Sequence, residues 1–178
     1  GSIYSKIMIT GGSTTLYLSS GTDASKVSVT GQIINVNITG DGAKGFITGT
    51  GVWVDVNQGG TLNITGSNAT VATSSGVINI TGHSTTVTTS NGTINITGLN
   101  NTITTSNGVV RMTGVNTVTT ASQKVYITGG NNTVTTANNV VNITGYSTTI
   151  SSSAGNVNIT GYTSTVTNAN GGKIVISG

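Results

Sequence analysis

The chain has 178 residues, of which only 5% are charged, and its formal net charge at pH 7 is +3. It contains no Cys, so neither disulfides nor thiolate metal sites support the fold. The six basic residues are scattered and form no cluster that could follow a phosphate backbone, so nucleic acid is not an expected partner. No apolar run approaches the roughly 20 residues that a membrane-spanning helix needs, and membrane insertion is not expected either.

Residues 1–65 are predicted to form irregular β coils that also cap the N-terminal end of the fold. Alternating segments that end in Thr-Gly recur here at varying spacing, at residues 7–11, 27–31, 36–40 and 46–49. All three acidic residues of the chain, Asp23, Asp41 and Asp55, lie in this region. The first two residues, Gly-Ser, have the form of a scar left by tag removal, which indicates that the natural N-terminus has been cut away.

Residues 66–178 form a regular repeat. Its segments begin at a Gly that follows Thr, at 16-residue intervals except for one of 15, and the last interval is 17: Gly66, Gly82, Gly98, Gly114, Gly129, Gly145 and Gly161. Each unit contains two short alternating runs separated by polar turns, a pattern that is the signature of stacked coils. The sequence therefore predicts an all-β fold, a β-solenoid (β-helix) of stacked two-strand coils with a 16-residue repeat, continuous with residues 1–65 in one domain.

The alternation within one unit assigns its side chains to the inside or the outside, because successive residues of a strand point to opposite faces. In the first run, Val87 points inward and its two Thr neighbours point outward. In the second run, Ile94 and Ile96 point inward, while Asn95 and Thr97 point outward. The shorter and longer intervals change the length of turns only, so every strand keeps its inward face. The predicted core is a thin stack of Val and Ile.

The outward residues of the first run form two columns along the solenoid. Neighbouring coils are about 4.7–4.9 Å apart, and the two outward residues of one strand are about 6.7 Å apart. Thr is β-branched and stiff at χ1, so its hydroxyls and methyls would form a regular array that can order surface water. We call the following residues the threonine array: Thr70, Thr86, Thr88, Thr102, Thr104, Thr117, Thr119, Thr133, Thr135, Thr149, Ser151, Thr165 and Thr167.

Side chains that could catalyse a reaction are scarce. The regular coils contain no carboxylate side chain and a single His, His83, which lies in a predicted turn. The three Asp residues lack the spacing of a calcium loop, and no Ser or Thr has a nearby base to activate it. The sequence therefore predicts neither an enzyme nor a cofactor or metal site.

The Thr-x-Thr ladder, the low charge and the short period resemble the hyperactive antifreeze proteins of insects. The Asn-Asn-Thr-Val/Ile segments at residues 100–103 and 131–134 are similar to the ryegrass antifreeze repeat, and residues 145–149 and 161–165 resemble bacterial ice-nucleation repeats. The resemblance covers residues 66–178, without the insect proteins' disulfides. It implies an ice-binding (antifreeze) protein that is secreted or displayed on a cell surface, and whose partner is ice or ordered water.

Two other interpretations remain open from the sequence. Outward Thr also favours strands in general, so the array could serve only as a strand-forming surface. The Thr-, Asn- and Gly-rich coils also resemble those of phage tail needles and of mycobacterial repeat domains that lack an assigned activity, which keeps a structural spike, fibre or cell-surface solenoid as the alternative function. No helix or charge run caps the C-terminal segment, residues 173–178, so the solenoid ends and faces offer surfaces for oligomer formation.

Overall fold

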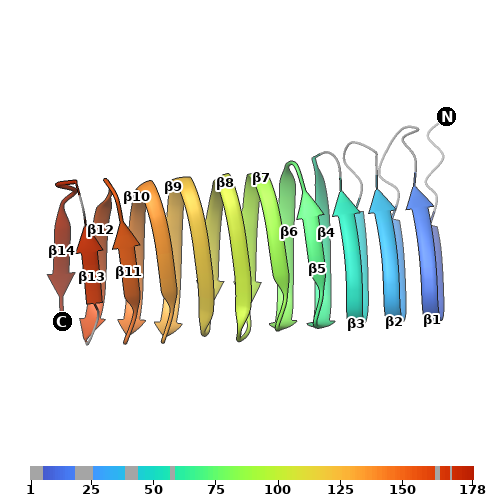
Figure 1. Ribbon diagram of the computed structural model, residues 1–178. Helices are drawn as coiled ribbons and strands as arrows, with labels where there is room; N and C mark the ends of the chain where they lie inside the picture. Colours follow the sequence, from blue (N-terminus) through green and yellow to red (C-terminus); the bar gives the residue numbers. More distant parts are fainter. Residues whose placement is uncertain (1–5, 19–25, 39–43, 57–58, 163–164, 169) are drawn as a thin grey trace.

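The computed structural model describes residues 6–18, 26–38, 44–56, 59–162, 165–168 and 170–178. These residues form an all-β solenoid of stacked coils in which neighbouring strands pair in parallel, as predicted (Figure 1). In chain order the strands are β1 (Lys6–Leu18), β2 (Lys26–Ile38), β3 (Lys44–Val56), β4 (Gly60–Ser67), β5 (Thr70–Thr73), β6 (Gly76–His83), β7 (Thr86–Thr97), β8 (Asn101–Thr113), β9 (Asn116–Gly130), β10 (Thr133–Tyr146), β11 (Thr149–Ser152), β12 (Asn156–Tyr162), β13 (Thr165–Asn168) and β14 (Ile174–Ser177).

Each coil contributes to two opposite faces. Strand β7 illustrates this, because its first part pairs with β5 on one face and its last part pairs with β6 on the other. The long strands of the structure continue through a corner in the same way, whereas other coils are divided into two short strands. The flat cross-section follows from the sequence, since each unit has two alternating runs with small polar residues between them.

The register of the strands keeps equivalent residues above one another along the solenoid. Where the repeat is one residue short, Thr102 still pairs with Thr117 and Val110 with Val125, so the missing residue is lost from the turn. The first three strands are also in register, with Lys26 between Lys6 and Lys44. The varying spacing of residues 1–65 therefore does not disturb the paired strands.

The core is a stack of Val and Ile side chains from the two faces. The predicted inward residues Val87, Ile94 and Ile96 are buried, as are their equivalents in neighbouring coils. Burying apolar area of this kind stabilises a protein by about 25 cal/mol per Å², and here every coil from β3 to β12 contributes. Within the described residues, no helix is long and apolar enough to cross a membrane.

One corner of the solenoid requires glycine because successive coils approach closely there. A Cβ atom added to Gly82 would overlap the carbonyl oxygen of Gly66, and one added to Gly145 would overlap that of Gly129. Two residues further on the backbone turns through positive φ, for example 58° at Asn100, a conformation that Asn tolerates better than most residues. The Thr-Gly steps of the sequence therefore mark this corner.

The same corner contains a buried ladder of asparagines that the sequence analysis assigned to a polar turn. Asn101, Asn116 and Asn132 are each at most 2% exposed. The Oδ1 atom of Asn116 accepts from the backbone N–H of Asn101 at 3.1 Å, and the Oδ1 atom of Asn132 accepts from the N–H of Asn116 at 2.8 Å. These bonds satisfy backbone groups that would otherwise be buried without a partner. Buried amides thus continue the core at a position that Ala69 occupies in an earlier coil and Thr85 and Thr148 occupy in others.

Buried hydroxyls line the opposite corner. Thr89 donates its hydroxyl hydrogen bond to the carbonyl oxygen of Asn91, at 3.3 Å. In the next four coils the equivalent oxygens, those of Thr105, Thr120, Thr136 and Ser152, are buried and have no hydrogen-bond partner in the described structure. An unpaired buried hydroxyl costs about 1–3 kcal/mol. Unless they bind a buried water, these corner hydroxyls are expected to lower the stability of the solenoid.

Replacing one such hydroxyl by a methyl group should stabilise the protein. We expect Thr120→Val, a change that preserves shape, to raise the free energy of unfolding by about 1 kcal/mol, measured by denaturant titration. The matched control is Thr89→Val, which removes a hydroxyl that has a partner and should be neutral or destabilising. A lower stability of Thr120→Val would show that its hydroxyl is hydrogen-bonded, for example to a buried water.

Candidate functional site

The structure places the whole threonine array on one face of the solenoid. One column pairs in the order Thr70, Thr86, Thr102, Thr117, Thr133, Thr149 and Thr165, and the other in the order Ala72, Thr88, Thr104, Thr119, Thr135, Ser151 and Thr167. Every residue of the threonine array is exposed. The predicted site residues are therefore brought together, in two uninterrupted columns across seven coils.

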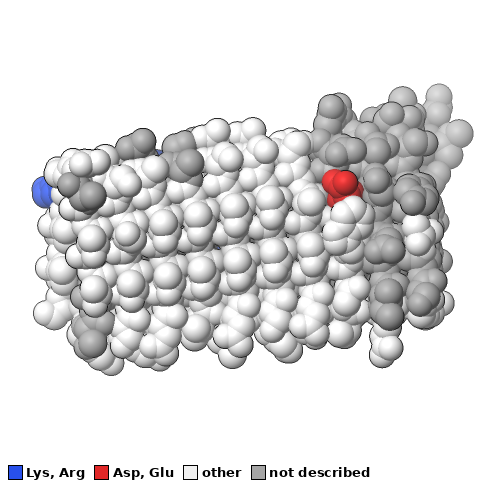
Figure 2. Space-filling model, in the orientation of Figure 1, with Lys and Arg blue, Asp and Glu red and all other residues white. Residues whose placement is uncertain are grey.

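The surface formed by the array is regular and uncharged. Figure 2 shows rows of similar side chains running along this face, without a Lys or Arg among them. Parallel strands hold neighbouring rows about 4.7–4.9 Å apart, and the pleat holds the two columns about 6.7 Å apart. The β-branched side chains are fixed by packing against their neighbours in adjacent coils. The face is thus a repeating pattern of hydroxyl and methyl groups at nearly constant spacing.

The hydroxyls of the threonine array make no hydrogen bond to another protein group in the described part of the chain. Their donors and acceptors therefore face the solvent, and water is the partner that must satisfy them. Because the columns are in register, the hydroxyls of successive coils are separated by the distance between neighbouring strands, about 4.7–4.9 Å.

The opposite face has a different surface chemistry. There the amide of Asn79 donates to Asn63 at 2.9 Å, and that of Asn95 donates to Asn79 at 2.8 Å, so half-buried amides bind one another. The ladder is then interrupted by Arg111, whose guanidinium lies 5.4 Å from the centre of the Tyr126 ring. This face is neither uniform in shape nor free of charge, which distinguishes it from the threonine array.

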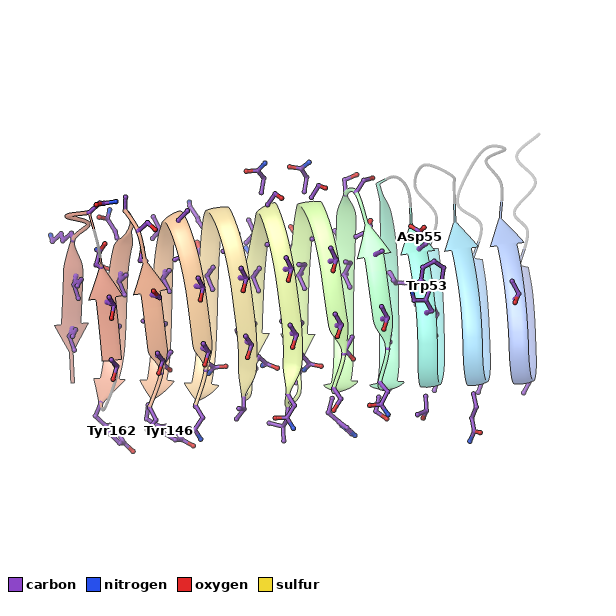
Figure 3. All side chains as sticks on the ribbon, viewed as in Figure 1. Trp53, Asp55, Tyr146 and Tyr162 are labelled. Carbon is purple, nitrogen blue, oxygen red and sulfur yellow. The ribbon has the colours of Figure 1, made fainter. Side chains whose placement is uncertain are left out.

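Two residues that the sequence analysis did not connect with the array mark its N-terminal end. Trp53 pairs with Thr70 and Asp55 pairs with Ala72, so both lie in the two columns, one coil before the array begins (Figure 3). The Trp53 side chain is 43% exposed. The offset from the preceding Thr-Gly step could have revealed this, because Trp53 follows Gly49 at the same distance as Thr70 follows Gly66. A bulky ring and a carboxylate thus end the flat surface.

Other functional chemistry is sparse in the residues that the structure describes. These residues contain no group of three or more His, Cys, Asp or Glu side chains that could hold a metal ion. His83 is exposed, but it is the last residue of strand β6 and does not lie in a turn as predicted, because the chain bends only at Ser84. Asp23 and Asp41 lie outside the described residues. The exposed rings of Tyr146 and Tyr162 stack on each other with their centres 6.0 Å apart, at the edge between the faces (Figure 3).

Comparison with known proteins gives no match to a protein-family model, to a curated protein sequence or to a solved structure. The function of the protein is therefore inferred from the threonine array itself.

Proposed function

We propose that the protein binds ice through the threonine array and acts outside the cell as an antifreeze protein. The observation that carries the proposal is the uniformity of the array: two exposed columns of Thr or Ser in register over seven coils, with Ala72 the only other residue in them. Such a surface repeats along one direction at about 4.7–4.9 Å, near the separation of about 4.5 Å between two waters that hydrogen-bond to the same third water at tetrahedral angles.

Adsorption to ice would use both groups of the Thr side chain. The methyl group offers an apolar surface around which water forms a cage, and the hydroxyl anchors that water by hydrogen bonds. Since each contact with water contributes little, many equivalent contacts must act at the same spacing. The six intervals between the first and last coils of the array extend over about 29 Å, and they repeat without a charged side chain. Rigidity lowers the entropy cost of forming this ordered layer.

A strand-forming role alone does not account for the contrast between the two faces. Both faces need good strand formers, and both contain a column of Thr. Only the face of the threonine array has two matching columns, however, whereas the second column of the other face includes Asn95, Arg111 and Tyr126. This difference favours a function that depends on regularity at the threonine array over a purely structural role.

Direct observation of a growing ice crystal tests the proposal. In a solution of the purified protein, a single crystal held slightly below its melting point should become faceted and stop growing until a lower temperature is reached. A crystal that grows as a smooth disc at the same rate as in a solution of an unrelated protein of equal concentration would rule out antifreeze activity. In that case the structural alternative, a spike or surface solenoid, would be favoured.

A further inference from the structure

The basic residues are scattered in the sequence, but the stacking of the coils gathers them on one face. Strand pairing places Lys6, Lys26 and Lys44 at the same position of three successive coils. Lys44 pairs with Thr61, and Thr61 pairs with Val77 of β6, on the face opposite the threonine array. Half of the positive charges of the chain therefore lie in one column, about 4.7–4.9 Å apart.

The other three basic residues lie on the same face. Lys124 and Lys173 occupy the register position of Lys44, as the pairing of the residues that follow each of them shows. Arg111 lies in the adjacent column, where it pairs with Tyr126. Lys44, Arg111, Lys124 and Lys173 are exposed. We call this surface the basic face, defined by Lys6, Lys26, Lys44, Arg111, Lys124 and Lys173.

Among the residues that the structure describes, no acidic side chain lies on the basic face. Asp55 belongs to the face of the threonine array, and Asp23 and Asp41 lie outside the described residues. Figure 2, which views the threonine array, shows Lys and Arg side chains only at its margins. Like charges opposite each other in neighbouring strands are destabilising, so the column of lysines has a cost that an anionic partner would offset. The charge distribution favours such a partner for this face.

Exposed apolar side chains lie among the positive charges. Val77 is in the column of Lys44, and Phe46 follows Lys44 by two residues on the same face. Their side chains are 36% and 43% exposed. Lys and Arg next to exposed apolar side chains suit the boundary between lipid headgroups and acyl chains, where both kinds of group find a favourable environment.

We propose that the basic face binds the surface of a membrane that contains anionic phospholipids, so that the threonine array points away from the membrane into water. This inference does not depend on ice binding. It concerns adsorption to the headgroups, without a segment that crosses the membrane. The phosphate and carboxylate groups of the lipids would be the partners of the six basic side chains.

The spacing of the charges favours a planar partner over a linear polyanion. The column extends over about 48 Å from Lys6 to Lys173, along coils that stack in a nearly straight row (Figure 1). Between Lys44 and Lys124 it has a gap of about 24 Å, which is several times the Debye length of about 8 Å at physiological ionic strength. A single anionic chain would leave its charges in that gap without partners. A flat anionic surface, in contrast, faces all six basic residues at once.

Cosedimentation of the 178-residue chain with lipid vesicles tests the inference in the absence of ice. At about 0.1 M salt we expect binding to phosphatidylcholine vesicles that contain about 30% phosphatidylserine, and none to vesicles of phosphatidylcholine alone. About 1 M salt should release the protein, because it shortens the Debye length to about 3 Å. Absence of binding to the anionic vesicles would overturn the inference. Tighter binding to double-stranded DNA than to these vesicles would also overturn it and would assign the basic face to nucleic acid.

A triple variant removes half of the charge of the basic face. Lys44→Gln/Arg111→Gln/Lys124→Gln should weaken vesicle binding about 100-fold, since each charge near an anionic surface strengthens it about fivefold. The matched control Lys44→Arg/Lys124→Arg keeps the charge and should bind as the wild type does. All of these side chains are exposed, so the melting temperatures should stay similar. Equal vesicle binding by the triple variant and the wild type would contradict the proposal.

The orientation on the membrane distinguishes the basic face from adsorption by net charge alone. Because the chain has no Cys, a single introduced Cys can carry a polarity-sensitive dye. Thr113→Cys places the dye on the basic face and Thr104→Cys places it on the threonine array, both at exposed positions of β8. We expect anionic vesicles to shift the emission of the dye at position 113 to the blue and to leave that at position 104 unchanged. Equal shifts at both positions, or a shift at position 104 alone, would overturn the inference.

Discussion

Thr119→Tyr should abolish thermal hysteresis while leaving the melting temperature of the protein almost unchanged. Thr119 lies near the middle of the threonine array, paired with Thr104 on one side and Thr135 on the other, and its side chain is exposed. A tyrosine ring there would hold the flat surface away from the ice lattice over several neighbouring threonines. The ring would not enter the core, because the side chain at position 119 points outward whereas that of the adjacent Val118 is buried. The effect is measured as the gap between the freezing and melting temperatures of a single ice crystal.

Thr128→Tyr is the control for this prediction. Thr128 is exposed on the opposite face, in register with Thr113 and Thr144, and the change in volume is identical. If the threonine array binds ice, this variant keeps most of its activity. Loss of activity in Thr128→Tyr alone would assign ice binding to the other face. Two variants as active as the wild type would show that the array is only a strand-forming surface.

Ile96→Ala should lower the free energy of unfolding by about 2–5 kcal/mol, the range for large-to-small changes in protein cores. Ile96 is 2% exposed and stacks between Ile80 and Met112 of the neighbouring coils. Because backbone hydrogen bonds hold these coils apart on both sides, the core has little freedom to collapse into the cavity. Urea titration followed by circular dichroism measures the loss.

His83→Ala is the control for the core, since His83 is exposed at the corner and contributes no side chain to the hydrophobic stack. We expect a change within about 0.5 kcal/mol, as for most surface substitutions. If His83→Ala proves more damaging than Ile96→Ala, the assignment of stability to the Val and Ile stack is wrong.

The fold could be predicted from the sequence because the repeat fixes register as well as strand type. Once Thr102 and Thr117 occupy equivalent positions, alternation determines that Ile103 and Val118 point inward, and the structure confirms both. The missing residue in this coil could be assigned to a turn for the same reason. A shift within a strand would have reversed an entire face.

The corners could not be predicted in the same way. Alternation ends where the chain turns, so nothing in the pattern indicated that Asn116 points inward while its neighbours do not. The buried role of Asn116 depends on a hydrogen bond to the backbone of the adjacent coil, which is a contact between coils and not a property of one repeat. Thr120 is also buried at a corner, although it appears in the sequence as one more Thr of a polar run.

The N-terminal end of the threonine array was also not predicted from the sequence, for a related reason. The irregular spacing before residue 66 obscures the alignment of Trp53 and Asp55 with the threonine columns. Strand pairing in the structure supplies that alignment directly. It also shows that the array begins at Thr70 because of a change in side chains and not because of a change in backbone structure.

Adsorption to ice tests the central claim most directly. A polycrystalline ice hemisphere can be grown slowly from a dilute solution of the fluorescently labelled protein, and the protein content of the ice is then compared with that of the remaining liquid. Binding through the threonine array predicts that the wild type is enriched in the ice and that Thr119→Tyr is excluded from it. Exclusion of the wild type to the same extent as a labelled protein without ice affinity would contradict the claim.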